Sequence, residues 1–129
     1  VYGPQSLECP ETADRVFLLP DGKLLPCPGF TGTAVADGMP SLGEMSLEAA
    51  VTDSPLSRFC EEVKAGRLTR NPQCRDCDFF SECGMGCRAY ALTENGRVDD
   101  VDPRACAMYR QGWKQRFARV NAEWREGED

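Results

Sequence analysis

The cysteines are the residues of this chain best suited to chemistry. There are eight of them in 129 residues, and no histidine accompanies them. Four stand in the run Cys74-Arg-Asp-Cys77-Asp-Phe-Phe-Ser-Glu-Cys83-Gly-Met-Gly-Cys87, and Cys106 follows after eighteen further residues. Two cysteines separated by two residues can place both thiolates at one metal site from a single tight turn. Four thiolates in so short a segment would crowd one metal centre, so the run is expected to supply ligands to two metal sites.

The composition of the chain helps to decide whether these thiols form disulfides, bind metal or take part in catalysis. An even cysteine count predicts disulfides in a secreted chain and metal ligands in a cytosolic one. The start, Val1-Tyr2-Gly3-Pro4, has no signal-peptide pattern, which favours a cytoplasmic location and a metal. Its lack of Met suggests a fragment of a longer chain or a processed product. Without histidine, mixed Cys/His zinc sites and Cys–His catalytic pairs are excluded. Two zinc sites of four thiolates each stay open as an alternative to iron–sulfur clusters.

A β-hairpin must position two further cysteines. Two short apolar runs, 15–19 and 23–27, flank Asp21-Gly22, a dipeptide typical of hairpin turns. Cys9 precedes the first run and Cys27 ends the second. The hairpin is therefore expected to make these two cysteines neighbours in space.

Helices and loops complete the expected frame. Residues 28–45 are rich in glycine, proline and threonine and are predicted to form a loop. Two short helices are expected at 46–51 and 54–65, each beginning at a serine that can cap it. Cys60 shares the apolar face of the second helix and should face inward.

The C-terminal part is predicted to be helical. A short helix is expected from Arg88 to Glu94, ended by Asn95-Gly96. The dipeptide Asp102-Pro103 opens a long amphipathic helix to about Arg125. Its apolar stripe, with steps of three and four, consists of Cys106, Tyr109, Trp113, Phe117, Val120 and Trp124. The predicted fold class is a small, irregular α+β domain: one N-terminal β-hairpin, short helices, cysteine-rich metal-binding loops and one long C-terminal helix.

This cysteine pattern resembles the SPASM domain of radical S-adenosylmethionine (SAM) enzymes. The resemblance covers about residues 8 to 110 and includes a glycine in the hairpin turn and proline dipeptides flanking the run. The matching positions are Cys9-x12-Gly22-x4-Cys27, Asn71-Pro72, Cys74-x2-Cys77-x5-Cys83-x3-Cys87, Gly84-Met85-Gly86, Arg88-Ala89, Asp102-Pro103 and Cys106. On this reading residues 1–7 are a linker remnant, 8–125 a SPASM-like iron–sulfur domain and 126–129 an acidic tail.

The resemblance implies two auxiliary [4Fe–4S] clusters. Cys74, Cys77, Cys83 and Cys106 would ligate one cluster, and Cys9, Cys27 and Cys87 would ligate the other. Whether Cys60 completes the second cluster, or is a small core residue beside an open site, is left undecided. Phe79 and Phe80 are expected to shield a cluster or belong to the core, while Arg75 and Arg88 either offset cluster charge or lie on the surface.

The implied function is that of a C-terminal auxiliary-cluster module. It would transfer electrons and position substrate in a radical SAM oxidoreductase or maturase that acts on a peptide or protein. Its partners would be the radical SAM barrel of the parent chain and that substrate. The C-x3-C-x2-C motif of the SAM cluster is missing, so the chain is not expected to be catalytic alone or to use SAM outside the missing core domain.

Other classes remain as alternatives or are excluded. Pro28 stands where sulfatase-maturing relatives carry an acidic base, which weakens that particular reading. The alternatives are a zinc-stapled structural or interaction module without redox chemistry, and a stand-alone ferredoxin-like carrier. A net charge of -6 argues against nucleic-acid binding, and no apolar run approaches the length of a membrane span.

Overall fold

The computed structural model describes residues 15–126, in which the predicted hairpin is confirmed. Strand β1 (Phe17–Leu18) pairs antiparallel with β2 (Leu24–Leu25), with Phe17 opposite Leu25. The N–H of Gly22 donates to the carbonyl of Leu19 at 2.9 Å and closes the turn. Gly22 has a φ of 90°, a left-handed conformation that glycine adopts without a Cβ clash.

The hairpin forms one side of the hydrophobic core. Helices α2 (Ala34–Asp37), α3 (Leu47–Thr52) and α4 (Pro55–Lys64) supply the other side. The core consists of Leu24, Leu25, Ala36, Met39, Ala50 and Leu56. Cys60 packs against it and is half-buried, so the prediction that it faces inward is confirmed.

Residues 28–45 contain more structure than the predicted loop. A 3₁₀ turn, η1 (Pro28–Phe30), directly follows Cys27, and α2 follows it. The Cys27 side chain accepts a hydrogen bond from the N–H of Gly29 at 3.4 Å, which begins the turn. Phe30 is fully buried and meets Phe59 of α4 edge to face, with ring centroids 5.4 Å apart. This buried aromatic contact stabilises a segment that its composition assigns to loop.

Both predicted serine caps are confirmed. Ser46 accepts a hydrogen bond from the N–H of Ala49 at 3.1 Å at the start of α3. Ser54 accepts from the N–H of Leu56 at 3.0 Å and forms a reciprocal capping box with Ser57. The Ser54 hydroxyl also donates to the carbonyl of Ala50, so one buried side chain joins α3 to α4.

Removing the second cap should therefore destabilise the domain more than removing the first. We expect Ser54→Ala to lower the free energy of unfolding by about 2 kcal/mol, because buried N–H groups lose their acceptor. The matched Ser46→Ala variant removes an exposed cap and should cost about 0.5 to 1 kcal/mol. Urea unfolding followed by circular dichroism measures both, and equal losses would contradict a joining role for Ser54.

The second half of the chain consists of short helices. They are η2 (Arg67–Thr69), α5 (Pro72–Arg75), α6 (Phe80–Cys83), α7 (Arg88–Asn95), α8 (Pro103–Arg110) and α9 (Trp113–Glu126). Helix α7 ends at Gly96, whose φ is 80°, so this predicted helix is confirmed. Neither α5 nor α6 was predicted, because four residues are too few to set up a helical apolar period.

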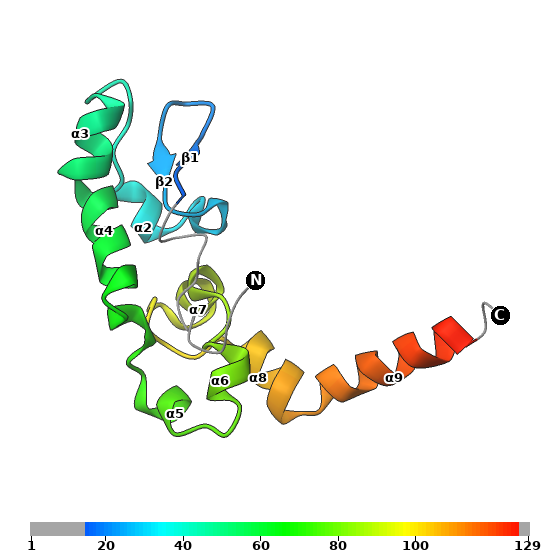
Figure 1. The fold of residues 1–129 in the computed structure, drawn as a ribbon. Coiled ribbons are helices and arrows are strands. Elements are labelled where there is room, and N and C mark those ends of the chain that lie inside the picture. The colour runs from blue at the N-terminus through cyan, green and yellow to red at the C-terminus, as the bar shows by residue number, and fades with distance from the viewer. Residues whose placement is uncertain (1–14, 127–129) are drawn as a thin grey trace.

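The predicted C-terminal helix is interrupted. It begins after Asp102 as expected, but Gln111 and Gly112 separate α8 from α9. Gly112 adopts a φ of 76°, which a right-handed helix cannot contain. Helix α9 extends away from the body of the molecule (Figure 1), and its apolar side chains Trp113, Phe117, Val120 and Trp124 are exposed.

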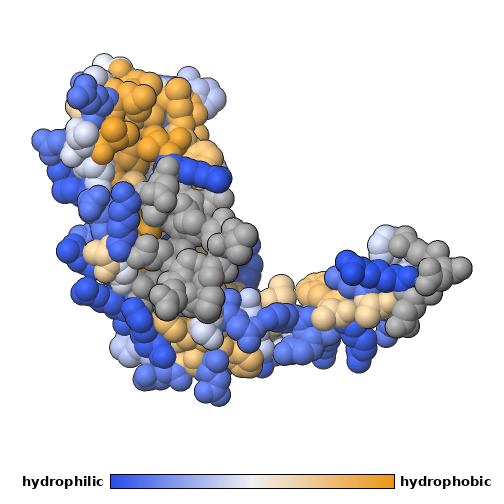
Figure 2. Space-filling model, in the orientation of Figure 1, coloured by the Kyte–Doolittle hydropathy of each residue, from blue (hydrophilic) through white to orange (hydrophobic). Residues whose placement is uncertain are grey.

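The predicted fold class is otherwise confirmed as a small, mostly helical domain with an N-terminal two-stranded hairpin. Apolar surface also gathers at the end formed by the hairpin and α3 (Figure 2). Val16, Leu18 and Leu47 are among the exposed apolar side chains there. Over residues 15–126, the helices are all too short or too polar to cross a membrane.

Candidate metal centre

Four of the predicted ligands line a single pocket. Cys74, Cys77, Cys83 and Cys106 line a small cavity of about 30 Å³ that is partly open to solvent. The rest of the wall is mainly apolar and includes Phe79, Phe80, Met85, Val101, Ala105 and Tyr109. We call this space the four-cysteine pocket. The structure thus brings together the residues that the resemblance assigns to one cluster.

Three of the four pocket thiols lie on short helices, and Cys77 lies in the turn between α5 and α6. Cys74 lies on α5, which begins where Asn71 accepts a hydrogen bond from the N–H of Gln73 at 3.0 Å. Cys83 ends α6, and Cys106 lies in the middle of α8. The N–H of Cys77 donates to the carbonyl of Cys74 at 3.1 Å, closing the tight turn expected of the C-x2-C pair.

The turn from Cys83 to Cys87 has an unusual backbone. Gly84, Met85 and Gly86 have φ values of 58°, 67° and 70°, so three consecutive residues are left-handed. A left-handed conformation costs a residue with a Cβ about 1 to 2 kcal/mol, and Met85 is that residue here. Burial of the Met85 side chain offsets this cost. Burial raises the pKa of the Cys83 thiol, and a backbone hydrogen bond from Met85 partly offsets that rise.

Asp102 ties this turn to α8. One carboxylate oxygen accepts from the N–H of Cys87 at 2.7 Å. The other caps α8 by accepting from the N–H groups of Arg104 and Ala105 at 2.9 and 3.3 Å. Since Asp102 is buried, these charge-assisted bonds form away from water and fix the turn against the helix that carries Cys106.

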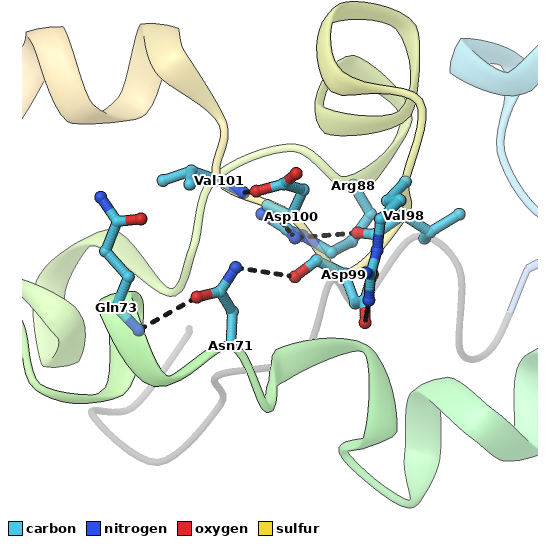
Figure 3. A network of polar contacts seen from close by, with 8 residues as sticks. Asn71, Gln73, Arg88, Val98, Asp99, Asp100 and Val101 are labelled. Atoms are coloured by element: carbon cyan, nitrogen blue, oxygen red, sulfur yellow. Dashed lines mark hydrogen bonds and ion pairs between the residues drawn. The ribbon is translucent and has the colours of Figure 1, made fainter.

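Arg88 makes a second tie between the same segments. Its guanidinium donates to the carbonyls of Val98 and Asp100 at 2.9 and 2.7 Å and to that of Met85. Figure 3 shows Arg88 reaching the segment 98–101, which Asn71 also contacts through the carbonyl of Asp99 at 3.3 Å. This segment leads directly into α8, so Arg88 and Asn71 help to set the position of Cys106.

Burial dominates the electrostatics of the pocket. It raises the pKa of the Cys74, Cys83 and Cys106 thiols above the ordinary value of 9.0, and the charges of neighbouring cysteines raise each pKa further. Arg88 opposes this rise at Cys74, and Arg110 opposes it at Cys106. These thiols hold their protons at neutral pH, so a metal that binds here must displace them.

The other predicted ligands lie outside this pocket. Cys87 is exposed at the start of α7, and η1, which begins at Cys27, packs against that helix. Cys60 lines a different pocket with Arg15 and Val16, in which no other described cysteine takes part. Cys9 falls outside the described residues, as do the linker remnant and most of the acidic tail.

Four thiols around one mainly apolar pocket are the donor set both of a [4Fe–4S] cluster and of a four-thiolate zinc site. Over residues 15–126, however, no three or more cysteine, aspartate or glutamate side chains are arranged to hold a metal ion.

Comparisons with known proteins add no assignment. The chain matches no protein-family model, no curated protein and no solved structure. Arg88 and Asp102 are the site residues whose importance the sequence left unclear. Asp102 was recognised as a helix start, and Arg88 was placed equally well on the surface, where most arginines lie. The surface alternative is wrong for Arg88, because only 3% of its area is exposed.

Proposed function

We propose that this chain is an auxiliary iron–sulfur domain in which Cys74, Cys77, Cys83 and Cys106 hold one [4Fe–4S] cluster. The observation that carries the proposal is that these thiols, from segments 32 residues apart at the extremes, line one apolar pocket. The cluster would supply electron transfer when bound. The chain would supply the ligands, the Met85 N–H to the Cys83 sulfur, and aromatic walls that limit access of water.

A second [4Fe–4S] cluster at Cys9, Cys27 and Cys87 belongs to the same proposal. Its support is the packing of η1, which begins at Cys27, against the helix that Cys87 begins. The N–H of Gly29 already donates to the Cys27 sulfur, as N–H groups do at cluster ligands. Cys60 would be the fourth ligand, or that position would be open to substrate.

In the cell this domain would serve a radical SAM oxidoreductase or maturase as its electron-transfer and substrate-positioning module. The parent chain would provide the catalytic barrel, and a peptide or protein would be the substrate. The reducing cytoplasm suits seven or eight thiols kept available for iron. No residue of the described chain is proposed as a catalytic acid or base.

Anaerobic preparation of the whole chain tests the proposal. The protein should be brown, with broad visible absorbance that dithionite bleaches, and should contain about eight iron and eight sulfide per chain if both sites fill. About four of each would support the four-cysteine pocket alone. A colourless protein with stoichiometric zinc and no sulfide, even when made anaerobically, would overturn the proposal and favour the zinc-stapled module.

A further inference from the structure

Arg88 carries a buried positive charge, and no carboxylate of residues 15–126 accepts a hydrogen bond from it. Its side chain is fully enclosed, and its hydrogen-bond acceptors are the backbone carbonyls of Met85, Val98 and Asp100. Its Nε is a buried side-chain atom with no hydrogen-bond partner in the part of the chain described. Buried charges in proteins are normally paired, and Asp102 acts on Arg88 without a hydrogen bond to it, so a further counter-charge is expected close by.

The thiols supply that counter-charge once they bind metal. The ionisable groups whose charges act on the guanidinium are Cys74, Asp102, Cys87 and Cys83. The Asp102 carboxylate is already occupied by three backbone N–H groups. Cys74 and Cys83 line the four-cysteine pocket, whereas Cys87 belongs to the other proposed ligand set. Arg88 is thus placed where it acts on ligands of both sets.

We propose that Arg88 is a positioning residue whose buried guanidinium compensates cluster charge and raises the reduction potential of the cluster in the four-cysteine pocket. This inference rests on the proposed function. A cubane with four thiolates carries excess negative charge, and an added electron increases it. A fixed positive charge in a medium of low dielectric therefore stabilises the reduced cluster more than the oxidised one.

The position of Arg88 also gives it a structural role. It joins the left-handed turn at Met85 to the segment 98–100 that precedes α8. Figure 3 shows Arg88 beside that segment. The planar guanidinium reaches three carbonyls in different directions, which a lysine ammonium on its flexible stem cannot reproduce. Charge and geometry can therefore be separated by substitution.

Redox titration of the whole chain, monitored by electron paramagnetic resonance, separates the effect of the Arg88 charge from that of its geometry. Arg88→Gln removes the charge and should lower the midpoint potential of the cluster by at least about 59 mV. For one electron, this is a tenfold lower ratio of reduced to oxidised cluster at a fixed potential. Arg88→Lys keeps the charge and should stay closer to the wild-type midpoint. The matched control, Arg75→Gln, removes an exposed charge next to Cys74 and should shift the midpoint much less, because water screens it.

Each outcome decides the inference. An unchanged midpoint in Arg88→Gln, with wild-type iron content, would overturn it while leaving the proposed function intact. If Arg88→Gln takes up no cluster, rescue of iron content by Arg88→Lys supports charge compensation, and failure of both variants assigns Arg88 a purely geometric role and overturns it. A wild-type chain without iron or sulfide would overturn the proposed function itself, and the inference with it.

Discussion

Cys106→Ser is expected to remove the cluster of the four-cysteine pocket and to halve the iron and sulfide of the anaerobic chain, from about eight to about four of each. Cys106 lies more than twenty residues from Cys83 in sequence and reaches the pocket only through α8. Loss of one thiolate leaves one iron of a cubane without its ligand, whereas the second ligand set does not contain Cys106. The remaining cluster should keep its spectrum.

Neighbouring variants control this result. Ala107→Ser changes the next residue of α8, which does not line the pocket, and should retain full iron. Cys27→Ser should remove the other half of the iron, and the Cys27→Ser, Cys106→Ser double variant should have almost none. Wild-type iron and sulfide in Cys106→Ser would show that the pocket is not the cluster site. Cys60→Ser in the same series tells whether that thiol is a ligand or a core residue.

Local signals made much of the fold predictable. Asp21-Gly22 between two apolar runs specifies a tight turn by backbone conformation alone, and the hairpin forms there. Ser46 and Ser54 provide an acceptor for N–H groups that lack partners at a helix start, and both helices begin as expected. In each case the decisive contacts lie within four residues, so no knowledge of the tertiary structure is needed.

The prediction of one continuous C-terminal helix was wrong in part, because the apolar period and the backbone conformation disagree there. The apolar stripe continues through Gln111 and Gly112 with helical steps, and a single glycine does not by itself end a helix. Gly112 nevertheless adopts a φ of 76° and divides the stripe between α8 and α9. On α9 the stripe is exposed, so amphipathic spacing alone does not identify a buried face.

The site illustrates the same limit. The resemblance to the SPASM domain implies that Cys74, Cys77, Cys83 and Cys106 form one ligand set, and the structure places all four around one pocket. The groups that hold the pocket in shape are Arg88 and Asp102, whose contacts are to backbone atoms distant in sequence. Composition cannot reveal such contacts, because any side chain can meet a carbonyl or an N–H. Only the tertiary fold distinguishes a buried arginine from an exposed one.

Gly86→Ala is expected to be the most destabilising single-methyl change in the turn that links the two cysteine sets. A Cβ at Gly86 would lie 2.5 Å from both the Cβ of Ala105 and a carboxylate oxygen of Asp102. Both neighbours belong to the start of α8, so relieving the overlap moves that helix or breaks the Asp102 contact to Cys87. Because a Cβ at a φ of 70° adds backbone strain, the free energy of unfolding should fall by about 3 to 5 kcal/mol.

Gly84 provides a matched control two residues earlier in the same turn. Its φ of 58° is equally left-handed, but a Cβ there would meet nothing within 4 Å. Gly84→Ala should therefore lower the free energy of unfolding only through strain of the left-handed backbone, by about 1 to 2 kcal/mol. Anaerobic urea unfolding followed by circular dichroism, with iron content measured in parallel, compares the two. We expect a lower urea midpoint and less bound iron in Gly86→Ala, because packing of this turn against α8 is what holds Cys83 and Cys106 at one pocket. Equal losses in the two variants would mean that the close contact at Gly86 contributes nothing to the site.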